Sequence, residues 1–91
     1  MKTIWKYYLS ISGKSSLNLP LGYRILSFGN QDEKPVIWVL HEADNPTKKI
    51  EFRLFGTGEF INEGLDDLEH IGTALFRSGR VVFHLFKIRE E

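Results

Sequence analysis

The residues of this chain that could do chemistry include three histidines. His41, His70 and His84 stand far apart, without the HxH or HExxH spacing that places two imidazoles on one metal ion. His84 lies between Phe83 and Leu85, where it would be either a hydrogen-bonded structural residue or a general base in a shallow pocket. The sequence therefore predicts no metal site and no cofactor, and it leaves a small hydrolase using His84 as one option.

The segment Gly56-Thr57-Gly58 is a second candidate site. A phosphate loop needs four residues between its glycines and then Gly-Lys-Ser/Thr opening a helix, whereas Glu59 follows here and would repel an anion. A turn or bulge with a glycine at positive φ explains the segment more simply. The Gly-Thr pair of residues 56–57 recurs at Gly72-Thr73, which suggests two related corners of the sheet whose threonine hydroxyls bond nearby backbone. For a small-ligand or nucleotide-sequestering protein, the candidate residues are Arg53, Gly56, Thr57, Gly58, Arg77, Arg80 and His84.

An acidic segment spans residues 59–69, which contain no lysine or arginine. It does not follow the alternating pattern of a calcium loop, so its carboxylates form either a solvated helix face or a surface for a basic partner. The candidate partner-binding residues are Glu59, Glu63, Asp66, Asp67 and Glu69. Basic residues cluster near the last predicted hairpin, where they would hold an anionic ligand or pair with the acidic segment of a second copy. They are Arg77, Arg80, Lys87 and Arg89.

Length and charge limit the function classes. The 91 residues predict a single domain over 1–91, and 12 basic against 12 acidic residues give zero net charge, which argues against direct nucleic-acid binding. Without cysteine the chain has no disulfide, thiolate metal site or cysteine nucleophile. No segment approaches the roughly 20 apolar residues of a membrane span, so no membrane association and a cytoplasmic location are expected.

The elements that must position these residues show a period of two, which is typical of half-buried strands. The expected strands are residues 3–11, 23–29, 36–41, 50–54, 71–76 and 81–88, with 12–16 as a loop. Residues 62–70 are the predicted helix, because Leu65 and Leu68 are three apart. Short connections favour antiparallel pairing. The predicted fold is therefore mainly β with a minor α component: a curved antiparallel sheet or small open barrel of five or six strands with one short helix. Pairing of exposed edges between subunits would give a homodimer.

Six segments together resemble an uncharacterised family of short proteins encoded by phages, prophages and bacteria. They are residues 2–7 (KTIWKY), 19–26 (LPLGYRIL), 37–40 (IWVL), 52–58 (FRLFGTG), 71–73 (IGT) and 82–86 (VFHLF). Members commonly continue Gly-Thr-Gly with His-Pro, where this chain has Glu59-Phe60, so a site built on that histidine would be absent or altered here.

The resemblance implies a small accessory protein of phage or mobile DNA. Such a protein would be non-enzymatic and act by stoichiometric binding in the host cytoplasm, for example as an inhibitor of a host defence component. A neutral, cysteine-free chain without a catalytic motif fits this expectation. Nucleotide sequestration and hydrolysis by His84 remain the alternatives.

Overall fold

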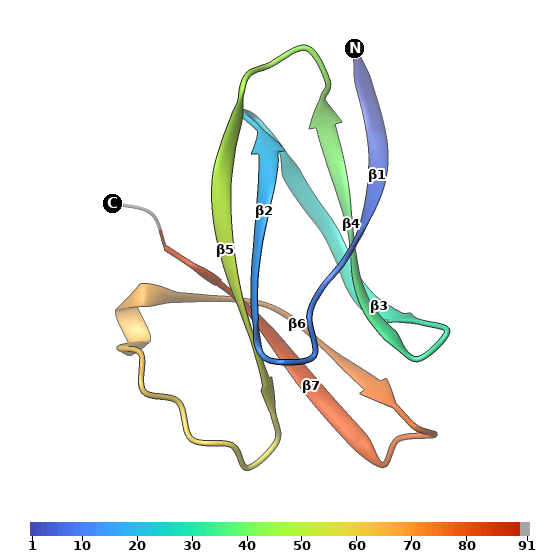
Figure 1. Ribbon diagram of the computed structural model, residues 1–91, viewed down its shortest axis with the longest axis vertical. Helices are drawn as coiled ribbons and strands as arrows, with labels where there is room; N and C mark the ends of the chain where they lie inside the picture. The colour runs from blue at the N-terminus through green and yellow to red at the C-terminus, as the bar shows by residue number, and fades with distance from the viewer. Residues whose placement is uncertain (90–91) are drawn as a thin grey trace.

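A computed structural model describes residues 1–89 of the chain. Over these residues seven strands and one short 3₁₀ turn follow one another (Figure 1). They are β1 (Lys2–Tyr8), β2 (Lys14–Pro20), β3 (Arg24–Gln31), β4 (Lys34–Glu42), β5 (Thr47–Gly56), η1 (Leu65–Asp67), β6 (Leu68–Phe76) and β7 (Val81–Ile88).

The strands form two antiparallel sheets. One has the order β1-β4-β3 and the other the order β2-β5-β7-β6. The antiparallel prediction is confirmed, and β4 is the central strand that its apolar run indicates. The expected count of five or six strands is wrong, because residues 14–16 do not remain in a loop but pair with β5 as part of β2.

The sheets pack on each other without closing into a barrel. Between them lie side chains with almost no exposure, and the alternation predicted for residues 50–54 is confirmed, since Ile50 and Phe52 are each 1% exposed. At the side where β3 lies along β6, Asn30 Nδ2 donates to the carbonyl oxygen of Leu75 (3.0 Å). The backbone N–H of Arg77 donates to the Glu33 carboxylate nearby. These two hydrogen bonds connect one sheet to the other.

Strand β5 joins the two halves of the four-stranded sheet. Its residues 47–53 pair with β2 and its residues 52–56 pair with β7. Phe52 and Arg53 are therefore the positions of β5 that have a partner on both sides.

The predicted helix over 62–70 is not confirmed. Within that segment the chain makes a single 3₁₀ turn, Leu65–Asp67, and then enters β6 at Leu68. Leu68 is buried, but Leu65 is 87% exposed, so the two leucines do not form one apolar stripe. Gly64, directly before the turn, has extended backbone (φ −67°, ψ 146°) and ends any continuation toward the N-terminus.

The hairpin predicted at residues 77–80 is confirmed. It joins β6 to β7, and Arg77, Ser78 and Gly79 all have positive φ, which Gly79 adopts without strain. The β3–β4 connection is shorter, with only Asp32 and Glu33 between the strands, both at positive φ.

Candidate functional site

The connection from β5 to β6 is the most exposed apolar feature of the described chain. We call residues 57–67 the acidic loop. It leaves the end of β5 and runs outside the sheet to the start of β6, drawn in yellow and orange in Figure 1. Phe60 is 90% exposed and Leu65 is 87% exposed, so neither side chain contributes to the core. The loop thus carries two large apolar side chains in water, between carboxylates.

Two side-chain contacts hold the first half of the acidic loop against β5. Arg53 Nε donates to Glu63 Oε2 at 2.9 Å, in an ion pair whose side chains are 19% and 28% exposed. The Gly56 N–H donates to Glu59 Oε1 at 3.0 Å. A partly shielded, directional ion pair restrains a loop more than a solvated one does.

Backbone bonds hold the second half. The Asp67 N–H donates to the carbonyl oxygen of Gly64 (3.0 Å), and the Arg89 N–H donates to that of Asp67 (2.8 Å). Leu68 is buried directly after the turn. The loop is therefore anchored at both ends and presents Phe60 and Leu65 from a fixed frame.

The five predicted partner-binding carboxylates do not form one continuous face. Glu59 and Glu63 bind groups of β5, as described above. Glu69 lies in β6, opposite Lys87 in the register of β6 with β7. Asp66 and Asp67 sit on the exposed turn η1. The structure thus brings four of the five into the acidic loop and leaves Glu69 in a strand.

A chain of hydrogen bonds joins two threonines and two histidines on the outer face of the four-stranded sheet. Thr57 Oγ1 lies 2.7 Å from His84 Nε2, and Thr73 Oγ1 lies 2.9 Å from His84 Nδ1. His70 Nε2 lies 3.3 Å from Thr73 Oγ1. His84 is half-buried, while the other three residues are exposed. The imidazole of His84 is thereby fixed at both ring nitrogens.

This arrangement resembles a nucleophile, a base and a residue that orients the base. When Nε2 of His84 accepts from the Thr57 hydroxyl, Nδ1 carries the proton and donates to Thr73. The prediction that the hydroxyls of Thr57 and Thr73 bond nearby backbone is wrong, because both hydroxyls bond the His84 ring. In the sequence, the repeated Gly-Thr pair is the feature that indicates a role for the two threonines. No sequence feature indicates that His70 joins them.

The residues proposed for a small ligand are divided by the fold. Gly56, Thr57 and Gly58 lie near His84, but the N–H of Gly56 is taken by the Glu59 carboxylate and Arg53 is paired with Glu63. Arg77 and Arg80 lie in the β6–β7 turn. The turn lies beyond the pair Phe76–Val81, which is itself three register pairs, or about 10 Å along the strands, from Thr73 and His84.

The third histidine belongs to the other sheet. His41 is 6% exposed, and its Nε2 lies 2.9 Å from the Tyr7 hydroxyl. Over the described residues, no group of three or more His, Asp or Glu side chains is placed to hold a metal ion. The same residues include no helix of the length and apolarity that a membrane crossing requires.

The sequence matches a known protein family. A family model described as a domain of unknown function (DUF7352) matches residues 1–91. No curated protein and no solved structure matches the chain significantly.

Proposed function

The chain belongs to the DUF7352 family, a domain of unknown function, along its whole length, and we propose that it is a non-enzymatic protein that acts by stoichiometric binding of another protein through the acidic loop. The observation that carries this proposal is the exposure of Phe60 (90%) and Leu65 (87%) on a loop that is braced at both ends.

Exposed side chains of this kind are typical of binding anchors. Aromatic residues that fill a pocket of the partner dominate the energy of many interfaces. A loop already fixed in its bound shape loses less conformational entropy on binding, so more of the contact energy appears as affinity. The bonds of Arg53 to Glu63 and of Arg89 to Asp67 supply this preorganisation.

The charge around the anchors indicates the chemistry of the partner. Asp66 and Asp67 adjoin Leu65, so the complementary surface is an apolar pocket with lysine or arginine at its rim. Since the sequence resembles proteins of phages and prophages, the proposed partner is a protein in the cytoplasm of a bacterial host. Inhibition of a defence component by occupation of such a surface is the specific form of the proposal.

The test is capture of the partner from host extract with matched variants. Wild-type protein should retain one host protein in a 1:1 complex, and Phe60→Ser and Leu65→Ser should each weaken its retention at least tenfold. The control Leu75→Ser changes a leucine of β6 that is 61% exposed and lies outside the loop. Asp66→Lys with Asp67→Lys should slow association and reverse its salt dependence. If Phe60→Ser and Leu75→Ser retain the host protein equally well, the acidic loop is not the binding surface and the proposal is wrong.

A second candidate function follows from the 2.7 Å contact between Thr57 and His84. In an ester hydrolase the Thr57 Oγ would form a bond to the acyl carbon while His84 takes the hydroxyl proton and returns it to the leaving alkoxide. Water would then hydrolyse the acyl-threonine. Hydrolysis of an ester panel should be lost in Thr57→Val and in His84→Gln and kept in Thr57→Ser. Turnover that is absent, or the same in all variants, excludes this candidate.

Sequestration of a nucleotide is the remaining alternative. A hollow of about 380 Å³ lies under the acidic loop, and its lining includes Lys14 and Arg53 but also Glu59 and Glu63. The two carboxylates offset the two cations, which makes an anionic ligand a poorer fit than a protein partner. A nucleotide that raises the melting temperature of the wild type but not of Arg53→Gln would favour sequestration instead.

A further inference from the structure

Strand β1 is an open edge of the three-stranded sheet, and the N–H and C=O groups of every second residue have no partner strand in the described part of the chain. The Met1 carbonyl accepts from the Ala43 N–H and the Leu9 N–H donates to the Pro35 carbonyl, both at 2.9 Å. Each of these pairs is directly opposed in the register of β1 with β4, so the odd-numbered residues of β1 bond to β4. The N–H and C=O groups of Lys2, Ile4, Lys6 and Tyr8 therefore point away from the sheet.

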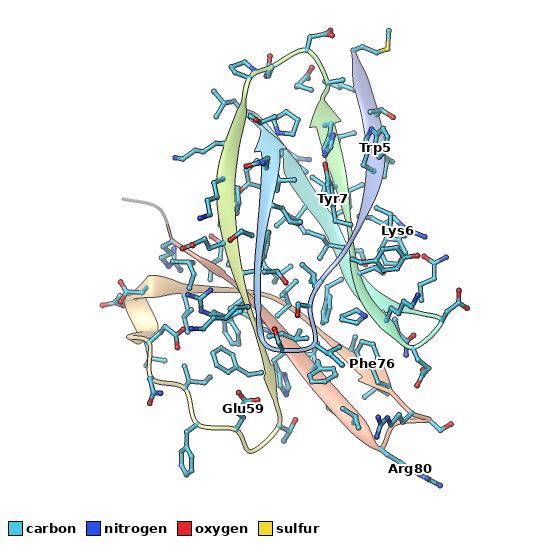
Figure 2. All side chains as sticks on the ribbon, in the orientation of Figure 1. Trp5, Lys6, Tyr7, Glu59, Phe76 and Arg80 are labelled. Carbon is cyan, nitrogen blue, oxygen red and sulfur yellow. The ribbon has the colours of Figure 1, made fainter. Side chains whose placement is uncertain are left out.

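The same strand exposes large apolar side chains on both of its faces. Ile4 (58%) and Tyr8 (52%) lie on the outer face of the sheet, while Trp5 (57%) lies on the inner face beside the buried His41. Figure 2 shows Trp5 and Lys6 at the outer margin of the molecule, with Tyr7 directed inward. An open edge of this composition is a template for another strand.

We propose that β1 pairs with β1 of a second copy of this chain, antiparallel and centred on Trp5, to form a homodimer. In this register Lys2 faces Tyr8, Thr3 faces Tyr7 and Ile4 faces Lys6 of the second copy. Trp5 faces the second copy's Trp5, and all seven residues of β1 are paired. The pairing is independent of the acidic loop and goes beyond the proposed function.

The two lysines of β1 select this register. The outward-pointing N–H and C=O groups of the two β1 strands must bond each other, so an even-numbered residue of one copy pairs with an even-numbered residue of the other. The nearest alternative registers are therefore centred on Ile4 or on Lys6. The first places Lys2 opposite Lys6, and the second places Lys6 opposite Lys6. Like charges directly opposed destabilise a strand pair. The pairing centred on Trp5 avoids both contacts and joins the two three-stranded sheets into one.

Strand β2, an edge of the four-stranded sheet, lacks these features. The Leu54 N–H donates to the Gly13 carbonyl and the Leu21 N–H donates to the Pro46 carbonyl, so the outward positions of β2 are the even ones. They are Lys14, Ser16, Asn18 and Pro20. Proline has no N–H to donate, and none of the large exposed apolar side chains of the described residues lies in β2.

The first test is proline substitution at one outward position of each edge. Lys6→Pro removes an N–H that points away from β4, and Ser16→Pro does the same on β2. In sedimentation equilibrium at about 100 μM, wild type and Ser16→Pro should be dimers and Lys6→Pro a monomer with an unchanged circular dichroism spectrum. A monomeric wild type, or dissociation by Ser16→Pro instead of Lys6→Pro, would overturn the proposal.

The second test does not depend on the folding of a proline variant. The chain has no cysteine, so a single introduced cysteine forms a disulfide only between copies. In the proposed register Trp5 and its counterpart form a pair without backbone hydrogen bonds, with Cα atoms about 4.5 Å apart. This lies at the short end of the range for a disulfide. Trp5→Cys should oxidise to a covalent dimer, whereas the matched control Thr3→Cys should remain monomeric on a non-reducing gel. Equal cross-linking of both variants, or none in Trp5→Cys, would refute the register.

Discussion

Lowering the pH should destabilise the protein through His41, and the contacts of this residue define the size of the effect. Its ring is 6% exposed, stacks on Trp5 with a centroid distance of 6.3 Å, and has the Tyr7 hydroxyl 2.9 Å from Nε2. Burial lowers the pKa of His41 and raises the pKa of Tyr7, because both charged forms lose solvation. The folded protein therefore holds His41 neutral at a pH where the unfolded chain binds a proton.

The sign and magnitude follow from proton linkage. The unfolded histidine takes up its proton near pH 6.5, above the pKa of the folded one, so the contribution of His41 is complete above about pH 6.5. As the pH is lowered further, this stabilising contribution of His41 decreases until the pH reaches the pKa of His41 in the folded protein, and below that pKa it is constant. Between the two values the free energy of unfolding decreases by at most about 1.4 kcal/mol per pH unit.

The assay is urea unfolding at pH 7.5 and pH 5.5, at one protein concentration, for wild type and His41→Gln. Glutamine keeps a hydrogen-bonding partner for Tyr7 but does not titrate. We expect His41→Gln to lose most of the difference in unfolding free energy between the two pH values. The control Leu75→Ala, which changes an exposed side chain of the other sheet that does not titrate, should keep it. If His41→Gln retains the full pH dependence of the wild type, the reasoning is refuted.

Three further predictions concern the core, the contact between the sheets and the histidine chain. Phe52→Ala removes a ring that is 1% exposed and should cost about 3–5 kcal/mol of unfolding free energy, while the exposed Leu75→Ala should change it by less than about 0.5 kcal/mol, both measured by denaturant titration. Asn30 Nδ2 donates to Glu33 Oε2 (2.7 Å), and this bond and the Arg77 N–H lower the pKa of Glu33, so the stabilising effect of the Glu33 carboxylate is lost as the pH falls through that lowered value. Asn30→Ala should raise the pKa of Glu33 in an NMR titration, and an unchanged pKa would show that the Asn30 side chain does not bond the carboxylate. Thr73→Val should free Nδ1 of His84 and change its ¹⁵N shift with less than about 1.5 kcal/mol of destabilisation, whereas an unchanged shift would show that Thr73 does not fix the ring.

Much of the fold could be predicted from alternation along the chain. Ile50, Phe52 and Leu54 indicate a strand because every second residue is apolar, and residues 77–80 indicate a hairpin from Ser-Gly at their centre. The first half of β2 could not be predicted, because Ser15 and Ser16 acquire strand conformation by pairing with β5. That pairing joins segments distant in sequence, which local composition does not encode.

The candidate site was less accessible to prediction, for two physical reasons. Phe60 and Leu65 look like core residues in sequence, and their exposure depends on how the acidic loop runs outside the sheet. His70 and Thr73 are three residues apart, so a regular strand would place them on opposite faces. A register shift between His70 and Gly72 inserts one extra residue and brings both to the His84 face.

The double pairing of β5 has a consequence for the order of assembly. Phe52 and Arg53 have partners in both β2 and β7, and Arg53 also holds Glu63 of the acidic loop. If either neighbouring strand detaches, the position of Arg53 is no longer fixed on that side and the brace on Glu63 loosens. The braced shape of the loop therefore requires that both β2 and β7 are paired with β5. A chain in which either strand is detached would carry Phe60 without the ion pair that braces its loop, so the proposed binding through the acidic loop requires both strand pairings.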